Sequence, residues 1–204
     1  ERYDKAVEIW ERYMKHTPLY EDRIKNHINM VQEMKRIKGT VPANAIPILE
    51  NITKDTYPGS GIRLHALRLL GSHYFTNKGY KDCIRVYQSL IADYPKELTE
   101  DVLLEYAQSL QEEEKFPQAV EIYKKLTNPS PDIQTRIIIC LSESGEDKEV
   151  ISMSNNLLKG TVPDLRTEQS RTGVPPVKVE SGLSPDQVTE LIYRRGISYK
   201  RNRF

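Results

Sequence analysis

The sequence contains few of the residues on which catalytic and metal sites usually depend, and it lacks long apolar runs. Among 204 residues there are two cysteines, four histidines and one tryptophan. No apolar run approaches the roughly 18 residues that a transmembrane helix needs, so we expect no membrane span. The 30 basic and 29 acidic residues nearly balance, which gives no electrostatic reason to expect nucleic acid as a partner. Hydrophobic residues make up 38%, enough for a thin core under a charge-rich surface.

The cysteines and histidines do not form a metal-binding pattern. Neither Cys83 nor Cys140 has a second cysteine or a histidine at metal-ligand spacing. We interpret both as small buried hydrophobic residues, with a disulfide between them as the alternative. His65 and His73 lie eight positions apart on one predicted helix, which is poor spacing for a metal pair. We therefore predict no metal, no cofactor and no enzyme activity.

Internal repeats are the strongest feature of the chain. Three segments share one apolar pattern, with steps of three, four, three and five residues. The segments are Tyr3, Ala6, Trp10, Tyr13 and Pro18; Tyr80, Cys83, Tyr87, Leu90 and Pro95; and Phe116, Ala119, Tyr123, Leu126 and Pro131. Steps of three and four mark one face of a helix, and the proline ends the unit because it cannot continue the helix.

A second helical pattern precedes each of the two later segments. Its members are Leu67, Leu70, Gly71 and Tyr74 in one case, and Leu103, Tyr106, Ala107 and Leu110 in the other. Gly71 and Ala107 occupy the same place. Because glycine inside a helix costs about 1 kcal/mol relative to alanine, we expect Gly71 to allow close packing of a neighbouring helix.

Together these residues resemble the tetratricopeptide repeat, whose signature is W-x2-L-G-x2-Y, then A-x3-F and P over about 34 residues. Here Leu67 replaces the usual tryptophan and Cys83 the usual alanine. The repeats Leu64–Glu97 and Glu100–Ile133 are shifted by 36 residues. The resemblance implies an all-α fold, a right-handed superhelical solenoid of antiparallel helix pairs.

We divide the chain into three parts. Residues 1–160 are expected to form the solenoid, with the second helix of one repeat followed by about four helix pairs. Its first and last pairs, Leu19–Pro58 and Asp132–Gly160, are irregular. Residues 161–184 contain several prolines and glycines and read as a loop or linker, and 185–204 as the first helix of a further repeat.

Three local features refine this division. Pro47 should kink the helix around Ala43 to Thr56 or delay its start. Ser184-Pro185-Asp186 is a good helix start, with an N-cap serine and a proline in the first turn. Gly196 and Tyr199 repeat the relation of Gly71 and Tyr74. Both ends of the chain are then open repeat faces, and we expect either a parent protein that continues in both directions or pairing with a second copy.

The resemblance also implies a concave groove, lined by the first helix of each repeat, that receives a protein or peptide. In the first repeat the groove side is His65, Arg68, Ser72, Phe75 and Thr76. In the second it is Asp101, Leu104, Gln108, Gln111 and Glu112. Such a groove has a basic and aromatic part beside an acidic and amide part. The alternative for each residue is an ordinary solvated helix face.

Some members of the family bind the C-terminal carboxylate of chaperones through lysine and asparagine at fixed places. The corresponding places here hold Arg68, Ser72 and Glu105, and a glutamate would repel a carboxylate. We do not expect this chain to bind such tails.

The function that follows is a scaffold or adaptor segment that binds a protein partner through the groove or the open end faces. The alternative is a regulatory or sensing domain of a larger enzyme, or of a secretion or signalling machine, and homo-oligomerisation through the open ends is a third possibility. A basic cluster near the C-terminus reads as an exposed helix face, with nucleic-acid contact as its alternative. Its members are Arg194, Arg195, Lys200, Arg201 and Arg203.

Overall fold

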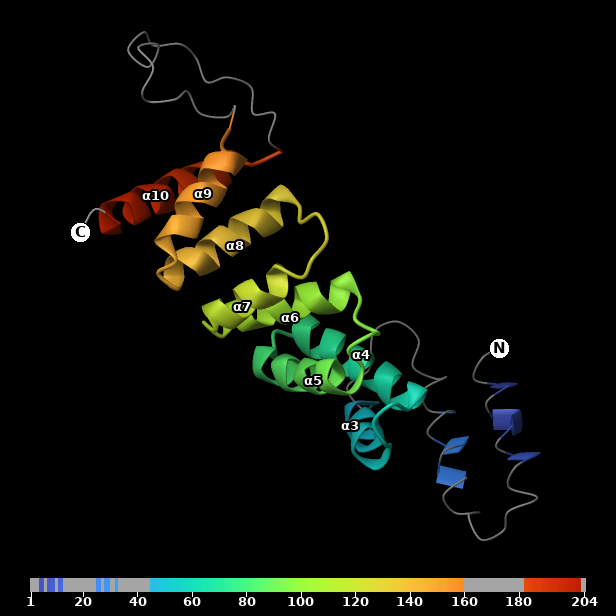
Figure 1. Cartoon of the computed structure of the whole chain (residues 1–204). Helices are drawn as coiled ribbons and strands as arrows, with labels where there is room; N and C mark the ends of the chain where they lie inside the picture. The colour runs from blue at the N-terminus through green and yellow to red at the C-terminus, as the bar shows by residue number, and fades with distance from the viewer. Residues whose placement is uncertain are drawn as a thin grey trace. The chain divides into compact units, whose positions relative to one another are not determined.

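The computed structural model describes residues 45–159 and 182–202, together with 4–5, 7–9, 11–12, 25–26, 28–29 and 32. Within 45–159 and 182–202 the chain has eight α-helices and no β-strand (Figure 1). The helices are α3 (Ile46–Asp55), α4 (Gly61–Thr76), α5 (Tyr80–Asp93), α6 (Glu100–Glu112), α7 (Phe116–Tyr123), α8 (Pro131–Glu143), α9 (Asp147–Leu157) and α10 (Pro185–Arg201). The all-α prediction is confirmed. The chain forms two units, Glu1–Glu105 and Tyr106–Phe204, which we describe separately.

Several predictions concern residues outside the described part of the chain. Most of the first aromatic segment, Tyr3 to Pro18, lies there, as does most of the helix expected from Ile24 to Ile37. The same holds for the expected linker, apart from residues 182–184. These predictions are left as they stand.

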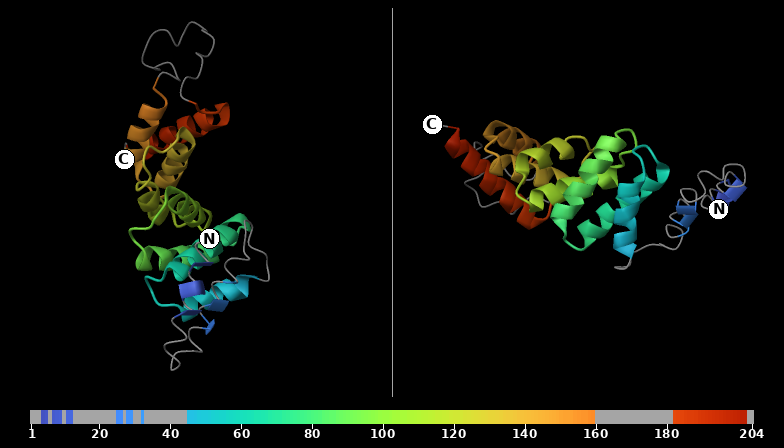
Figure 2. Two further views of the ribbon diagram at one scale, coloured as in Figure 1. Left: turned by 90° about the vertical axis from the view of Figure 1, so that its right-hand side faces the viewer. Right: turned by 90° about the horizontal axis from the view of Figure 1, so that it is seen from below.

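In the first unit, α4 packs against both α3 and α5, as the views in Figures 1 and 2 show. Each helix contributes large apolar side chains from one face, spaced three or four residues apart. Those fully buried are Leu49 and Ile52 of α3, Leu70 of α4, and Tyr87 and Leu90 of α5. Helix α3 begins at Ile46 with Pro47 in its first turn, so the predicted late start is confirmed.

The contact between α4 and α5 is closest at Gly71. A β-carbon placed there would lie inside the van der Waals surface of the Tyr87 ring, 2.8 Å from Cδ1 and closer to Cε1 and Cζ. Both residues are buried. The prediction that Gly71 allows a neighbouring helix to pack tightly is confirmed, and Tyr87 is the side chain that uses the space.

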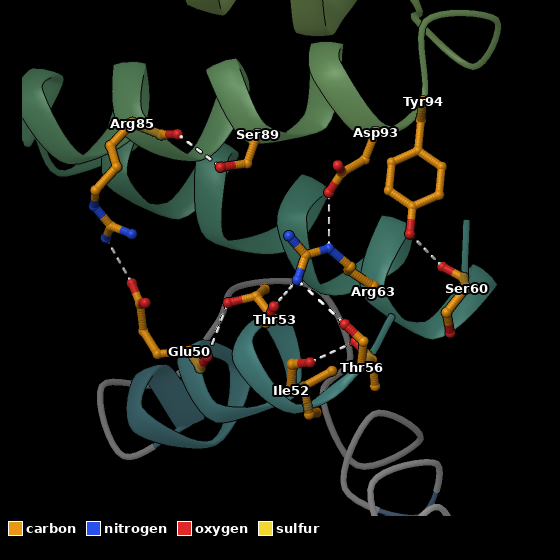
Figure 3. A network of polar contacts seen from close by, with 10 residues as sticks. All are labelled: Glu50, Ile52, Thr53, Thr56, Ser60, Arg63, Arg85, Ser89, Asp93 and Tyr94. Carbon is orange, nitrogen blue, oxygen red and sulfur yellow. Dashed lines mark hydrogen bonds and ion pairs between the residues drawn. The ribbon is translucent and has the colours of Figure 1, made fainter. Parts of the chain in front are cut away.

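Polar contacts of Arg63 tie α3 to α4 and α5 (Figure 3). The guanidinium of Arg63, near the start of α4, donates from Nε to Asp93 Oδ2 at 2.9 Å, at the end of α5. Its Nη1 donates to the main-chain carbonyls of Thr53 and Thr56, at the end of α3. The last carbonyls of a helix have no backbone N–H of a following turn to bond with. Arg63, from another helix, supplies the missing donor and so caps the C-terminus of α3. One side chain thus joins three helices.

Glu50 of α3 makes a second set of polar contacts, to α4 and α5. Its Oε1 accepts from Arg85 Nη2 of α5 at 2.8 Å and from the Tyr74 hydroxyl of α4 at 2.9 Å. Burial by itself would raise the pKa of Glu50, but the hydrogen bonds from Arg85 and Tyr74 outweigh it and lower the pKa below its usual value. Burial and the bond to Glu50 raise the pKa of Tyr74 to about 12, so this hydroxyl stays a donor.

This contact predicts a loss of stability in acid. A carboxyl whose pKa is lower in the folded than in the unfolded chain stabilises the fold above its unfolded pKa, and the stabilisation disappears as the pH falls through the folded pKa. We therefore expect the free energy of unfolding to fall less steeply with acidification in Glu50→Gln than in the wild type. Urea unfolding monitored by circular dichroism between neutral and acidic pH measures this slope. Parallel slopes in the two proteins would contradict it.

In the second unit, α8 packs against α7, α9 and α10, and α9 also packs against α10. The fully buried large side chains are Leu110, Tyr123, Ile138, Leu141 and Leu191. Helix α10 starts at Pro185, and the Ser184 hydroxyl and the Gln187 side chain form a reciprocal capping box. The predicted helix start is confirmed. The predicted turn at Ser144-Gly145 is also present, and Gly145 has φ +79°, which glycine adopts without strain.

Both cysteines are buried, as their interpretation as small hydrophobic residues requires. Burial raises the pKa of the Cys140 thiol to about 11, so it remains protonated at neutral pH.

Candidate functional site

Helix α4 carries the first half of the predicted groove. Its packing face holds Ala66, Leu67, Leu70 and Gly71, all buried. His65, Arg68 and Ser72 lie on another face, at steps of three and four, with Ser72 exposed and the other two half-buried. The apolar face fixes the helix, so the polar face is held in a defined orientation.

A carboxylate from α6 fixes part of this surface. Glu105 Oε1 accepts from the Ser72 hydroxyl at 3.2 Å, and Glu105 Oε2 accepts from the Tyr87 hydroxyl. Burial raises the pKa of Tyr87 strongly, and the bond to Glu105 adds to the effect, so the phenol remains a donor. Glu105 therefore connects α4, α5 and α6 within the first unit, and its negative charge has a fixed position.

Arg68 lies one turn before Ser72 on the same face. It donates from Nη2 to the main-chain carbonyl of Glu97, in the loop before α6. Its Nε is buried and has no hydrogen-bond partner within the described residues. Burial lowers the pKa of the nearby His65, and the charge of Arg68 lowers it further, so His65 is neutral at physiological pH. Arg68 is thus the cationic group of this face.

Phe75, the aromatic member of the predicted groove, is half-buried. Its ring lies edge-on to Tyr80 at the start of α5, with centroids 6.4 Å apart. This geometry is favourable for aromatic pairs, so Phe75 contributes to the α4–α5 contact as well as to the surface.

Helix α6 carries the second half of the predicted set. Asp101 is exposed in the first turn, where the helix dipole favours a carboxylate, and Leu104 and Gln108 are half-buried. Gln111 accepts a hydrogen bond at Oε1 from the Tyr123 hydroxyl at 2.9 Å. Six of the eight predicted residues fall in the first unit, whereas Gln108 and Gln111 fall in the second. The structure thus brings together His65, Arg68 and Ser72, and links Ser72 to α6.

Glu105 is the main site residue missing from the predicted groove. A spacing rule places Glu105 on a helix face but does not show which hydroxyl groups will reach its carboxylate. The same rule places Tyr87 on the packing stripe but does not show that its hydroxyl donates to Glu105. The signal in the sequence was a glutamate among the apolar residues of the second repeat's first helix, next to Tyr106.

The basic cluster of α10 is largely occupied by contacts inside the second unit. Arg194 pairs with Glu143 and with Glu190, the latter at 2.6 Å. Arg195 donates to Asn155 Oδ1 at 3.1 Å, and Arg201 donates to the Ser142 carbonyl at 3.2 Å. The interpretation of this cluster as an exposed face is therefore wrong for Arg194, whose side chain is only 18% exposed. A charge count along a helix does not reveal acidic partners on other helices.

In the part of the chain that the structure describes, no three histidine, cysteine, aspartate or glutamate side chains are grouped as metal ligands would be. None of the helices in that part combines the length and apolar composition needed to cross a membrane. Comparison of the chain with models of known protein families found no match, and comparisons with curated proteins and with solved structures found none either.

Proposed function

We propose that this chain is a segment of a tetratricopeptide-like solenoid that serves as a scaffold and binds a protein or peptide through the polar faces of α4 and α6. Support for the repeat comes from Gly71 and Tyr87, which pack as the two halves of the motif require. Further support comes from the second unit, where α10 packs on both α8 and α9, as the first helix of a following repeat would.

The observation that carries the binding proposal is that hydrogen bonds hold a cation, Arg68, and a carboxylate, Glu105, in place beside α4. Arg68 makes its one described bond to a main-chain carbonyl, and the guanidinium N–H groups other than the buried Nε remain to donate to a partner's carbonyl. Glu105 and Asp101 supply negative charge on α6. An extended segment with an acceptor near Arg68 and a basic side chain near Asp101 would match this arrangement.

The same geometry argues against a C-terminal carboxylate as the ligand. Glu105 is held in place by Ser72 and Tyr87, so its charge cannot easily move away from an incoming carboxylate. Repulsion of like charges at short range costs binding energy and gives specificity against such ligands.

A double substitution tests the proposal. In Arg68→Glu, Gln108→Arg the positive charge on α4 becomes negative and a positive charge is added to α6, and we expect loss of the partners that the wild-type chain captures from a native lysate. The measurement is mass spectrometry of the captured proteins. Circular dichroism shows whether the variant is folded.

The matched control places the same kinds of change on α5. Lys81 and Gln88 are exposed on that helix, and Lys81→Glu, Gln88→Arg should retain every partner. Equal retention by all three proteins would place binding elsewhere and make the assigned residues wrong.

A further inference from the structure

Two buried tyrosines reach from the core to polar side chains of α6. Tyr87 of α5 and Tyr123 of α7 occupy the same place in the two repeats, and both are almost completely buried. In the first unit, the Tyr87 hydroxyl donates to Glu105 Oε2. In the second unit, the Tyr123 hydroxyl donates to Gln111 Oε1 at 2.9 Å. Both acceptors belong to half-buried side chains, so each tyrosine connects the core to a side chain that reaches the surface.

The packing of these rings does not require their hydroxyl groups. A phenylalanine, which is the residue of the repeat signature at this place, would fill the same space. A buried hydroxyl costs free energy unless it finds a hydrogen-bond partner, and both of these hydroxyls find theirs on α6. Burial raises the pKa of both phenols, so each keeps its proton and acts as the donor. The hydroxyls therefore add an orienting contact to a packed core.

The contact from Tyr123 decides which end of the Gln111 amide meets a partner. Because Oε1 accepts from the buried hydroxyl, the NH2 group at Nε2 is the end that remains for other contacts. Nε2 has no hydrogen-bond partner among the described residues, and it is not buried. Gln111 thus presents donors, and the chemical group that suits donors is a carbonyl oxygen.

The contact from Tyr87 holds a charge. Glu105 accepts from Tyr87 at one carboxylate oxygen and from the Ser72 hydroxyl at the other, at 3.2 Å. Hydrogen bonds to an ionised group are stronger than those between neutral groups, so the carboxylate is held firmly. The chemical group that suits a fixed carboxylate is an ammonium or a guanidinium.

We propose that Tyr87 and Tyr123 are positioning residues of the partner-binding surface, which selects a basic side chain opposite Glu105 and a carbonyl group opposite Gln111. This inference rests on the proposed function. Both tyrosines are buried, so they act on the partner only through the side chains that they hold. A side chain that is already held in its binding orientation loses less conformational freedom when the partner arrives, which increases the affinity.

Substitution by phenylalanine removes each hydroxyl and keeps the ring. The probe is the protein that the wild-type chain retains most strongly from the lysate, purified and labelled for fluorescence anisotropy. Tyr87→Phe and Tyr123→Phe should each raise its dissociation constant about threefold to tenfold, as expected when one side chain must be ordered on binding.

Tyr94→Phe is the matched control. Tyr94 is also buried, but its hydroxyl donates to the main-chain carbonyl of Ser60 at 2.7 Å and holds no surface side chain (Figure 3). All three variants lose one hydrogen bond of a buried tyrosine, and Tyr94→Phe should leave the dissociation constant within about twofold of the wild type. A general loss of stability would affect all three alike.

Two further measurements separate positioning from a structural role. Nuclear magnetic resonance relaxation of the Gln111 NH2 group needs no partner, and this group should become more mobile in Tyr123→Phe but not in Tyr94→Phe. Once Glu105→Ala has removed the acceptor, adding Tyr87→Phe should change the dissociation constant less than about twofold, because the tyrosine acts only through the carboxylate.

Equal dissociation constants for Tyr87→Phe, Tyr123→Phe and Tyr94→Phe would overturn the inference, as would a Gln111 amide that stays as restricted in Tyr123→Phe as in the wild type. If Arg68→Glu, Gln108→Arg lost its partners while the phenylalanine variants bound like the wild type, this inference alone would fail. If that double variant retained every partner, the surface would not be the binding site, and the proposed function would fail with it.

Discussion

Gly71→Ala should destabilise the chain by about 2 kcal/mol, although alanine is the better helix former. In the interior of a helix, replacing glycine by alanine normally stabilises by about 1 kcal/mol. Here the new methyl group would overlap the Tyr87 ring, which is buried and bonded to Glu105 through its hydroxyl. Overpacking of a fixed core costs about 1–3 kcal/mol and more where the neighbour cannot move. The steric cost should therefore exceed the gain in helix propensity.

Urea unfolding measured by circular dichroism gives this difference. The matched control is Gly61→Ala in the same helix, where a β-carbon meets nothing within 4 Å, and its effect should stay within about 0.5 kcal/mol. Combining Gly71→Ala with Tyr87→Leu should cost less than the sum of the single changes, because the smaller side chain leaves room for the methyl group. Strictly additive costs would show that the ring is not the obstacle.

The close packing at Gly71 could be predicted from the sequence for a physical reason. The three- and four-residue spacing of a helix face involves only residues close together in the sequence. A glycine among leucines on such a face has few explanations other than close packing of a neighbouring helix. The start of α10 was predictable for the same reason, since Ser184 and Pro185 act within one turn of the helix. Both features depend on residues that are neighbours in the sequence.

The candidate site was only partly predictable because its contacts join distant residues. Ser72 and Glu105 are 33 positions apart, and Tyr87 and Glu105 are 18 apart. Periodicity places each residue on a face, but the pairing of particular side chains depends on how the helices pack. Arg194 shows the same limit, since its acidic partner Glu143 is 51 positions away.

Arg63→Met should be among the most damaging single changes in the first unit, with a cost of about 3 kcal/mol. The substitution keeps most of the apolar stem but removes the guanidinium. Asp93 would then keep a largely buried charge, since its side chain is only 17% exposed, and the carbonyls of Thr53 and Thr56 would lose a donor. Breaking one side of a buried ion pair is costly because the remaining charge is left without compensation.

The control is Arg85→Met, which removes the other arginine that reaches α3. The Arg85 side chain is 54% exposed, and Glu50 would still accept from Tyr74, so the cost should stay below about 1 kcal/mol. Adding Asp93→Asn to Arg63→Met should recover part of the loss, because it removes the uncompensated charge. Hydrogen exchange should show the amides of α3 exposed first in Arg63→Met. If the two arginine variants lost equal stability, the attachment of α3 would depend on its apolar face, Leu49 and Ile52, and not on the guanidinium that links the ends of three helices.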